Sequence, residues 1–243
     1  MDNKNNLIIP FAIIALAFII GIIIFVSVWS SNRNADQTIT VTGSAKKEIT
    51  SDLGIFRGTI NVEGNTAGDA YRILQQQKPI LLDYLNSNGF SQDKVEFFTV
   101  NSYPVYEMNA NGYQTNIVRA YVYSQRLEIR SPDVNKIKAL SLSVTSVIEK
   151  GINFMVEMPE YHYTKIADLK IEIQAAAAKD AMVRAKKIAE ATDRDLGPIR
   201  NARMGVIQIT PKLSNAISDY GVNDLSSIEK EITAVVNASF EID

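Results

Sequence analysis

The residues best suited to acid–base or metal chemistry lie in one short segment. Glu157, Glu160 and His162 fall within six positions, and Asp168 follows soon after. Carboxylates beside an imidazole can transfer protons or bind a metal ion. Pro159, however, is expected to end the preceding strand, which leaves these side chains in a loop where nothing makes them converge. The pattern favours a solvated connection and predicts neither a catalytic residue nor a metal ligand.

The composition excludes several other kinds of chemistry. The chain has 243 residues, no cysteine and one histidine, so disulfides, cysteine-bound zinc and thiol nucleophiles are absent. Its 25 basic and 27 acidic side chains offer no basic surface for nucleic acid. Glycine-rich phosphate-binding motifs and nucleophile elbows are also missing from the sequence. We therefore expect a protein that is not an enzyme, binds no cofactor and binds no nucleic acid.

Half of the ten tyrosines fall in one predicted hairpin, whose strands are joined by a predicted turn at residues 108–112; they are Tyr103, Tyr106, Tyr113, Tyr121 and Tyr123. Pairing of aromatic rings across the two strands would explain some of them. An interface is the alternative, because tyrosine is enriched where an apolar ring must keep its hydroxyl in water. We take the first four as candidate oligomer-interface residues, with the tip between Tyr106 and Tyr113 as the preferred contact.

A second polar pair lies on a helix rich in alanine. Asp180 and Arg184 are four residues apart, the spacing of a helical ion pair. Residues 175–178 are all alanine, which permits close approach of another backbone. This small face is predicted to pack against the protein's own sheet, with a neighbouring subunit as the alternative.

The elements that must position these residues follow from hydrophobic periodicity. Alternation predicts strands at 38–41, 53–63, 95–106, 117–130, 152–158, 199–209 and 232–242. Helical spacing predicts helices at 66–89, 131–151 and 166–191. Pro79 should kink or break the first helix. Alternation also predicts that Arg126, Glu128 and Arg130 lie on a wet face of the sheet.

This order of elements is typical of the α+β class. It predicts antiparallel or mixed sheets, helices on one face, and a parallel crossover around the second helix. A polar stretch, 210–227, is expected to be a long loop.

The N-terminal segment 7–29 contains no charge and is almost entirely apolar. As a helix it would be about 35 Å long, enough to cross about 30 Å of hydrocarbon. It is longer than the apolar part of a signal peptide and lacks a good cleavage site, which favours an uncleaved anchor. The anchor residues are represented by Leu7, Ile14, Gly21 and Trp29, and Trp29 suits the membrane interface.

The resulting domain plan has four parts: a cytoplasmic N-terminus (1–6), a transmembrane helix (7–29), a linker (30–37) and an α+β domain (38–243). The expected location is the inner, cytoplasmic membrane, crossed once, with the domain in the periplasm. Membrane lipid is the first expected partner.

Several stretches in order along the chain resemble a known family. They include residues 39–43 (ITVTG), 120–124 (AYVYS), the helix that leads to Gly197, and 231–242 (EITAVVNASFEI). Together they resemble the SIMPL-domain family (DUF541), which includes bacterial periplasmic immunogenic and oxidative-stress-defence envelope proteins. Members often carry a glycine near the position of Asp193, where this chain has none. The resemblance implies a SIMPL-type α+β fold of two βα halves, no established enzymatic activity, and in some members ring-like or channel-like homo-oligomers.

Two functions are therefore compared. The first is a membrane-anchored envelope protein that assembles through its domain into a homo-oligomer, such as a ring or channel-like scaffold, with a link to envelope stress. The alternative is a monomeric or dimeric periplasmic module that binds another envelope protein or a ligand. An enzyme that uses carboxylates ranks third, because no convergent titratable cluster is predicted.

Overall fold

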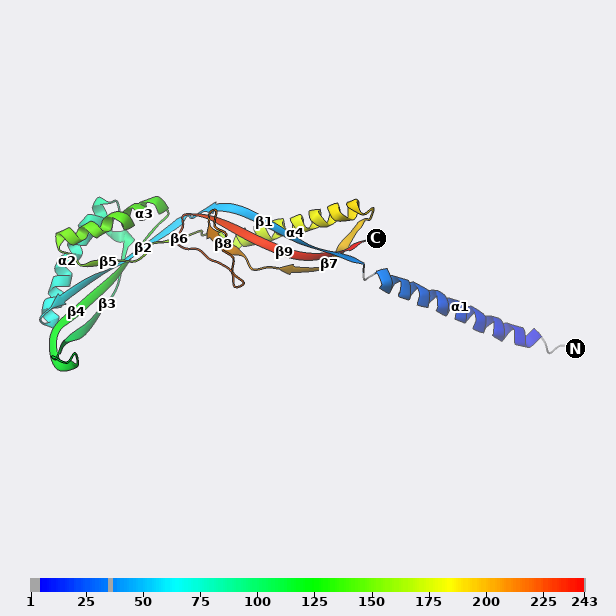
Figure 1. Cartoon of the computed structure of the whole chain (residues 1–243), viewed down its shortest axis with the longest axis horizontal. Helices are drawn as coiled ribbons and strands as arrows, with labels where there is room; N and C mark the ends of the chain where they lie inside the picture. The colour runs from blue at the N-terminus through cyan, green and yellow to red at the C-terminus, as the bar shows by residue number, and fades with distance from the viewer. Residues whose placement is uncertain (1–4, 35–36, 243) are drawn as a thin grey trace. The chain divides into compact units, whose positions relative to one another are not determined.

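The computed structural model describes residues 5–34 and 37–242, without the side chains of residues 5–12, 28 and 30–34 (Figure 1). The chain divides into two compact units. Unit 1 comprises Met1–Lys46, Lys170–Ile207 and Thr233–Asp243, and unit 2 comprises Lys47–Leu169 and Gln208–Ile232.

Unit 2 is built on a five-stranded sheet with two covering helices. Its elements are β2 (Leu53–Gly64), α2 (Ala67–Ser87), η1 (Gln92–Lys94), β3 (Val95–Met108), β4 (Gln114–Ser131), α3 (Val134–Ser143), η2 (Val144–Lys150), β5 (Phe154–Val156), β6 (Glu160–His162) and β8 (Gln208–Pro211). The strand order is β3-β4-β2-β5, and β6 also pairs with β2. β8 pairs with β9 (Glu229–Ile242) of the other sheet.

The strand directions confirm the predicted class and crossover. β2 pairs antiparallel with both β4 and β5, and β4 pairs antiparallel with β3. β4 and β5 therefore run parallel to each other with β2 between them, and α3 connects them. The order β2-α2-β3-β4-α3-β5 is a split β-α-β arrangement. Figure 1 shows α2 and α3 on the same face of this sheet.

The core of unit 2 lies between the sheet and these two helices. Alternate residues of β2, Phe56 and Ile60 among them, point into it. Leu74, Leu81 and Leu85 enter from α2 at helical spacing. Gly58 shares their face of β2, and a Cβ there would lie 2.2 Å from the Phe154 ring. The missing side chain at this position is therefore what makes room for the ring.

Unit 1 consists of a three-stranded part of the other sheet and two long helices. Its elements are α1 (Asn5–Asn34), β1 (Thr38–Thr50), α4 (Ile166–Ala191), β7 (Leu196–Met204) and β9, of which β1, α4 and β9 continue into unit 2. The strand order is β1-β9-β7. The predicted alternation of the last strand is confirmed, because Ala234, Val236, Ala238 and Phe240 of β9 are buried.

The alanine face of α4 packs on its own sheet, as the first of the two interpretations predicts. Ala177, Ala181, Ala185 and Ala189 are all buried. A Cβ at Gly43 of β1 would lie 2.3 Å from both the Ala177 carbonyl oxygen and the Ala181 nitrogen. The helix and strand therefore approach closely at residues with minimal side chains.

Several predicted boundaries were wrong for local reasons. α2 is one continuous helix through Pro79, so the break that was one of the two predicted outcomes is absent; buried leucines on both sides of Pro79 pack the helix against the sheet. The strand predicted at 152–158 is shorter, namely β5 at Phe154–Val156, and a second short strand, β6, follows Pro159 where the sequence predicts a loop. The helix predicted at 131–151 begins at Val134 and changes to a 3₁₀ helix at Val144, although it ends at Gly151 as expected.

Two further observations concern the ends of β1 and α4. The strand predicted at 38–41 extends to Thr50. Asp193, near the position where the related family often has glycine, adopts a φ of 54° just after α4. Aspartate tolerates this left-handed conformation better than most residues.

The segment predicted to span a membrane belongs to α1. Among the fully described residues, no helix is long and apolar enough to cross a membrane. The side chain of Leu7 lies outside the described residues, whereas Ile14, Gly21 and Trp29 lie inside them and are exposed. The anchor stays a prediction.

Candidate functional site

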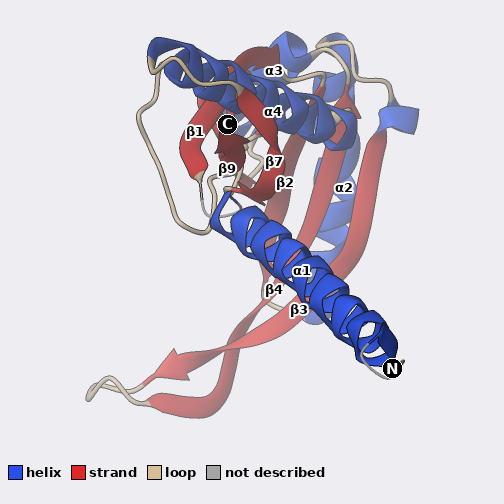
Figure 2. Ribbon diagram, turned by 90° about the vertical axis from the view of Figure 1, so that its right-hand side faces the viewer, coloured by secondary structure: helices blue, strands red, loops and turns tan. Residues whose placement is uncertain are grey.

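The β3–β4 hairpin extends beyond the rest of its sheet. β2 pairs with β4 only as far as the Gly64–Tyr121 position. Beyond that point β3 and β4 pair with each other alone. We call residues 102–121 the arm; its base, at residues 102–104 and 121, lies beside the end of β2, and residues 105–120 extend beyond it. Figure 2 shows the arm projecting away from the helices of unit 2. A two-stranded ribbon is marginally stable by itself in water, so the arm gains most by contacting a partner.

The tip of the arm is held by one asparagine. Asn109 Oδ1 accepts hydrogen bonds from the backbone nitrogens of Asn111 and Tyr113, at 3.0 and 2.9 Å. Gly112 adopts a φ of 80°, which glycine permits without strain, and its N–H donates to the Asn109 carbonyl. The turn predicted from residues 108–112 is thus confirmed.

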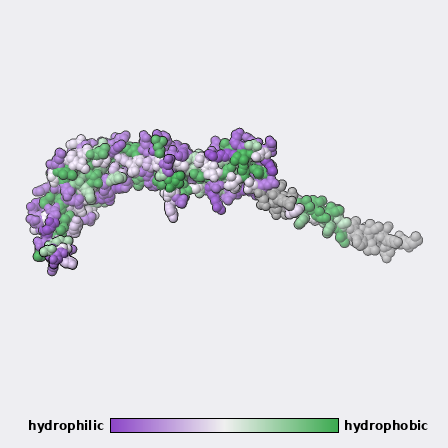
Figure 3. Space-filling view, in the orientation of Figure 1, coloured by the Kyte–Doolittle hydropathy of each residue, from purple (hydrophilic) through white to green (hydrophobic). Residues whose placement is uncertain are grey.

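The arm exposes apolar side chains with very few charges. Tyr103 is 55% exposed and Tyr113 is 71% exposed, and Met108 and Ile117 are exposed beside them. Figure 3 shows hydrophobic residues among hydrophilic ones at this tip. Glu107 and Arg119 are the only charged residues between 102 and 121. Exposed apolar surface of this kind typically marks a contact with another molecule.

The strand register tests the first explanation of the tyrosines, which is pairing of aromatic rings across the strands. Tyr103 lies opposite Val122, Tyr106 opposite Val118, and Tyr121 opposite Pro104, so no two of them pair across the strands. Tyr106 and Tyr121 are half-buried. Tyr123 lies outside the arm and makes an edge-to-face contact with Tyr71 of α2. Cross-strand aromatic pairing therefore does not account for the cluster.

The edges of the arm are poorly suited to adding another strand. β3 carries Pro104, which cannot donate a backbone hydrogen bond. The pairing steps from Val105–Ala120 to Tyr106–Val118, which leaves an extra residue on β4, and a further shift follows. Bulges and proline are common devices that keep strand edges from pairing. The faces of the arm are therefore better suited to a contact than its edges.

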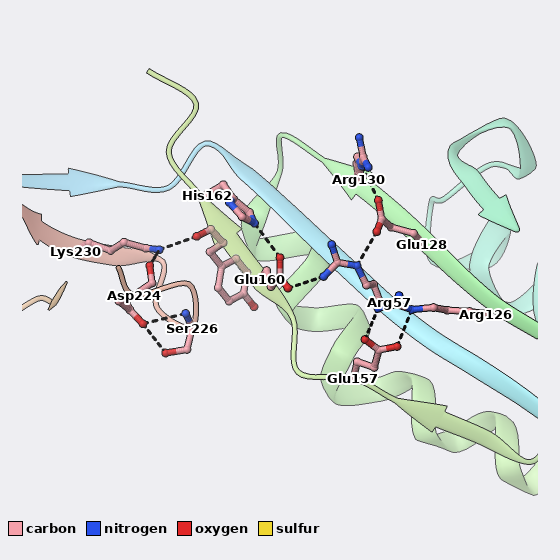
Figure 4. A network of polar contacts seen from close by, with 11 residues as sticks. Arg57, Arg126, Glu128, Arg130, Glu157, Glu160, His162, Asp224, Ser226 and Lys230 are labelled. Carbon is pink, nitrogen blue, oxygen red and sulfur yellow. Dashed lines mark hydrogen bonds and ion pairs between the residues drawn. The ribbon is translucent and has the colours of Figure 1, made fainter. Parts of the chain in front are cut away.

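A charged network lies on the side of the sheet away from the helices (Figure 4). Arg57 of β2 donates to Glu128 of β4 at 2.6 Å and to Glu160 of β6 at 2.5 Å. Arg130 donates to the other oxygen of Glu128 at 2.6 Å. The Glu128 side chain is only 5% exposed, which corrects the prediction that this face is wet throughout. A buried carboxylate requires such partners.

The segment with the candidate acid–base residues joins this network. His162 Nε2 lies 3.0 Å from Glu160 Oε2, and both residues belong to β6 rather than to a loop. Glu157 accepts two hydrogen bonds from Arg126. Asp168 is exposed on the first turn of α4. The expectation that these groups do not converge was wrong for Glu160 and His162, which contact each other, and the pairing of β6 with β2 brings Glu160 to Arg57 as well.

The pKa values of this network follow from its pairs. Burial by itself would raise the pKa of Glu128, but the hydrogen bonds from Arg57 and Arg130 outweigh burial and lower it. The contact with His162 lowers the pKa of Glu160, burial opposes this, and Arg57 lowers it further. Both carboxylates are therefore held ionised, which suits a structural clamp better than a general acid.

A buried lysine holds the C-terminal loop of unit 2. Lys230 is 2% exposed, and its ammonium donates to the carbonyl oxygen of Tyr161 at 2.6 Å and to that of Asp224. The Asp224 carboxylate in turn accepts from the backbone and hydroxyl of Ser226. Burial lowers the pKa of Lys230, and the nearby Asp224 opposes that shift. Figure 4 shows this clasp beside the β6 residues.

A polar pocket of about 310 Å³ adjoins the network. Lys94, Arg130 and Lys136 supply positive charge to its wall, and Glu128 and Asp93 supply negative charge. Lys136 already donates to the Gly89 carbonyl at 2.8 Å. The charges of both signs would suit a small zwitterion more than a simple anion.

The ion pair predicted on α4 is present and links the helix to β1. Asp180 accepts from Arg184 at 2.7 Å and from the Ser44 backbone nitrogen at 2.8 Å. The hydrogen bond from Ser44 and then that from Arg184 lower the pKa of Asp180. The pair thus supports the packing of the alanine face.

The sequence interpretation missed two of these groups. Arg57 and Lys230 gave no signal in the sequence, because Glu128 is 71 positions from Arg57 and Tyr161 is 69 positions from Lys230, and only the tertiary fold brings each pair together. Among the described residues, no three histidine or acidic side chains are grouped to hold a metal ion. The charged network and the Lys230 contacts hold strands and a loop in place, and the arm exposes an apolar surface.

Comparison with known families adds one result. The family described as SIMPL, protein of unknown function (DUF541), matches residues 39–240, which include strands and helices of both units. A comparison with curated proteins found no match. The match covers most of the chain, and the chain therefore belongs to the SIMPL (DUF541) family.

Proposed function

We propose that this protein is a membrane-anchored envelope protein that assembles into a homo-oligomer through its SIMPL domain and performs no catalysis. The observation that carries the proposal is the arm. Its exposed tyrosines and aliphatic side chains project on a ribbon of two strands that the rest of the sheet does not support. A second copy of the chain would bury this surface.

The N-terminal segment supports the anchoring part of the proposal. Phe18, Ile23 and Phe25 of α1 are exposed, and the uncharged segment 7–29 contains them. Exposed apolar side chains on all sides of a helix are stable in hydrocarbon rather than in water. Membrane lipid is therefore the first proposed partner, and other envelope proteins are further partners.

The proposed location is the inner membrane, with a single crossing and the folded domain in the periplasm. Protease added to spheroplasts should then degrade the domain of the full-length protein. Protection of the domain until the membrane is dissolved would place it in the cytoplasm and contradict this orientation.

The assembly is tested by the mass of the full-length protein in detergent. Replacing Tyr103 and Tyr113 by serine should lower the mass measured by light scattering, because both side chains are exposed on the arm. Tyr220→Ser is the matched control, since Tyr220 is 97% exposed and lies outside the arm. A wild-type protein with the mass of one chain would refute the proposed assembly.

A binding module is the second candidate function, and the polar pocket favours it. Its mixed charges around Glu128 and Arg130 would suit a small zwitterionic ligand or a charged segment of another envelope protein. An adaptor of this kind would be a monomer or dimer in detergent, so the same mass measurement separates the two functions.

A further inference from the structure

Unit 1 carries an apolar groove that nothing in the described chain fills. It has a volume of about 490 Å³ and lies between α4, β7 and β9. Met182 of α4, Leu196, Pro198 and Ile199 of β7, and Phe240 of β9 supply its wall. Ile199 is 54% exposed, and Met182 is also exposed. Figure 3 shows hydrophobic side chains gathered over the C-terminal half of α4, next to this groove.

The groove and the arm are complementary in chemistry. An apolar cavity of about 150 Å³ holds a benzene molecule, so a groove of this size has room for two or three side chains of the arm. Tyr113 and Met108 at the arm tip are the type of side chain that anchors protein interfaces. Lys179 lies at the rim of the groove, and Glu107 beside the arm tip has the opposite charge.

We infer that the arm of one copy inserts into the groove of another copy. The inference rests on the proposed self-assembly and specifies its contact. It follows from two unpartnered apolar surfaces on different units of the same chain, one projecting and one concave. Arm-to-arm pairing through strand edges is disfavoured by Pro104 and by the extra residues of β4.

This contact is heterologous, because each copy uses two different surfaces. After one such contact has formed, the copy that supplied the arm still has a free groove, and the other copy still has a free arm. Such contacts produce closed rings when the rotation between copies closes, and open chains when it does not. An isologous dimer would instead stop growing at two copies.

The absence of cysteine makes a direct test simple. The natural chain contains no Cys, so single cysteines can be placed at will. Tyr113→Cys is made in one full-length chain and Ile199→Cys in a second chain with a different tag, and the two are co-expressed. A short bis-maleimide linker is then applied to the detergent extract. The expected result is a cross-linked dimer that carries both tags.

Two controls accompany the mixed pair. Leu142 is exposed on α3, outside both surfaces. A chain with Leu142→Cys in place of Ile199→Cys should therefore give no dimer with both tags. Tyr113→Cys by itself should give no dimer, whereas arm-to-arm contact would produce one. If Leu142→Cys gives as much dimer with both tags as Ile199→Cys does, the cross-linking reflects random collision and the inference is overturned.

A variant without cysteine gives an independent readout. Ile199→Lys places a charge in the groove at an exposed position, so the fold should be retained. We expect a loss of assembly mass equal to that of the arm variant, with unchanged circular dichroism, whereas Leu142→Lys should leave the mass unchanged. Two results together would refute the arm-in-groove contact but not self-assembly. They are an unchanged assembly mass for Ile199→Lys and no cross-linked dimer between the Tyr113→Cys and Ile199→Cys chains. A wild-type protein that is a single chain refutes both.

Discussion

Glu128 is a carboxylate that water hardly reaches, held between the guanidinium groups of Arg57 and Arg130. Its position in β4 is fixed by the register that places it opposite Arg57 of β2. The alternation of the sequence correctly placed Glu128 on the side of the sheet opposite Leu127. It could not reveal the burial, because that depends on which strand lies next to β4.

Removal of Arg57 should destabilise the protein strongly. Arg57→Met leaves a buried carboxylate with one exposed partner, and we expect the free energy of unfolding to fall by about 2–4 kcal/mol. Arg126→Met is the matched control on the same sheet, since its pair with Glu157 is exposed on both sides and should contribute about 0–1 kcal/mol. Urea unfolding measures both, and equal effects would contradict the role of burial.

The lowered pKa of Glu128 predicts a dependence of stability on pH. Because the pKa is lower in the folded state, its stabilising effect is full above the ordinary value of 4.5 and is lost as pH falls through the folded-state pKa. The difference in unfolding free energy between wild type and Glu128→Gln should therefore be large at neutral pH and shrink on acidification. A difference that stays constant down to acidic pH would refute this assignment. Glu149→Gln, at an exposed position, serves as the control and should have no effect at any pH.

At the scale of elements, the close contact between β1 and α4 depends on Gly43. The helix was predicted from its apolar spacing, and its small face from four consecutive alanines. The sequence did not predict that this face packs against Gly43, because Gly43 lies more than 130 positions before Ala177 and Ala181. Packing of this kind is decided by which surfaces meet in three dimensions.

Gly43→Ala should therefore lower stability. The added Cβ would lie 2.3 Å from backbone atoms of α4, which must shift, and we expect a loss of about 3 kcal/mol. Gly68→Ala is the matched control in α2, where the nearest atom is 3.9 Å from the added Cβ. It should raise stability by about 0.5–1 kcal/mol, because alanine favours the helix. Thermal unfolding of the two variants in parallel tests the prediction, which fails if both move in the same direction.

At the scale of the whole molecule, the proposed anchor and the proposed assembly depend on each other. α1 ends at Asn34, and β1 begins at Thr38. Copies held in one membrane plane have a high effective concentration, on the order of millimolar for short flexible tethers. Contacts of modest strength would then be enough to hold the assembly together.

A chain that begins at Gln37 should therefore assemble less readily. It retains every strand and the hydrogen bond from Arg194 to Gln37. We expect its mass by light scattering to fall on dilution, whereas the full-length protein in vesicles remains cross-linkable at the same bulk concentration. Identical dilution behaviour of the two forms would show that tethering contributes nothing.

The sequence by itself determined the class of elements, the crossover around α3, the turn at Asn109 and the alternation of β9. These depend on local periodicity and on turn residues, which any one segment contains within itself. It also supplied the family, because the matching motifs follow one another over nearly the whole chain. Only the folded structure shows which tyrosines are exposed, that Glu160 contacts both His162 and Arg57, and that Glu128 and Lys230 are buried. These features depend on contacts between segments far apart in the chain, and neither residue type nor spacing along the chain encodes which segments become neighbours.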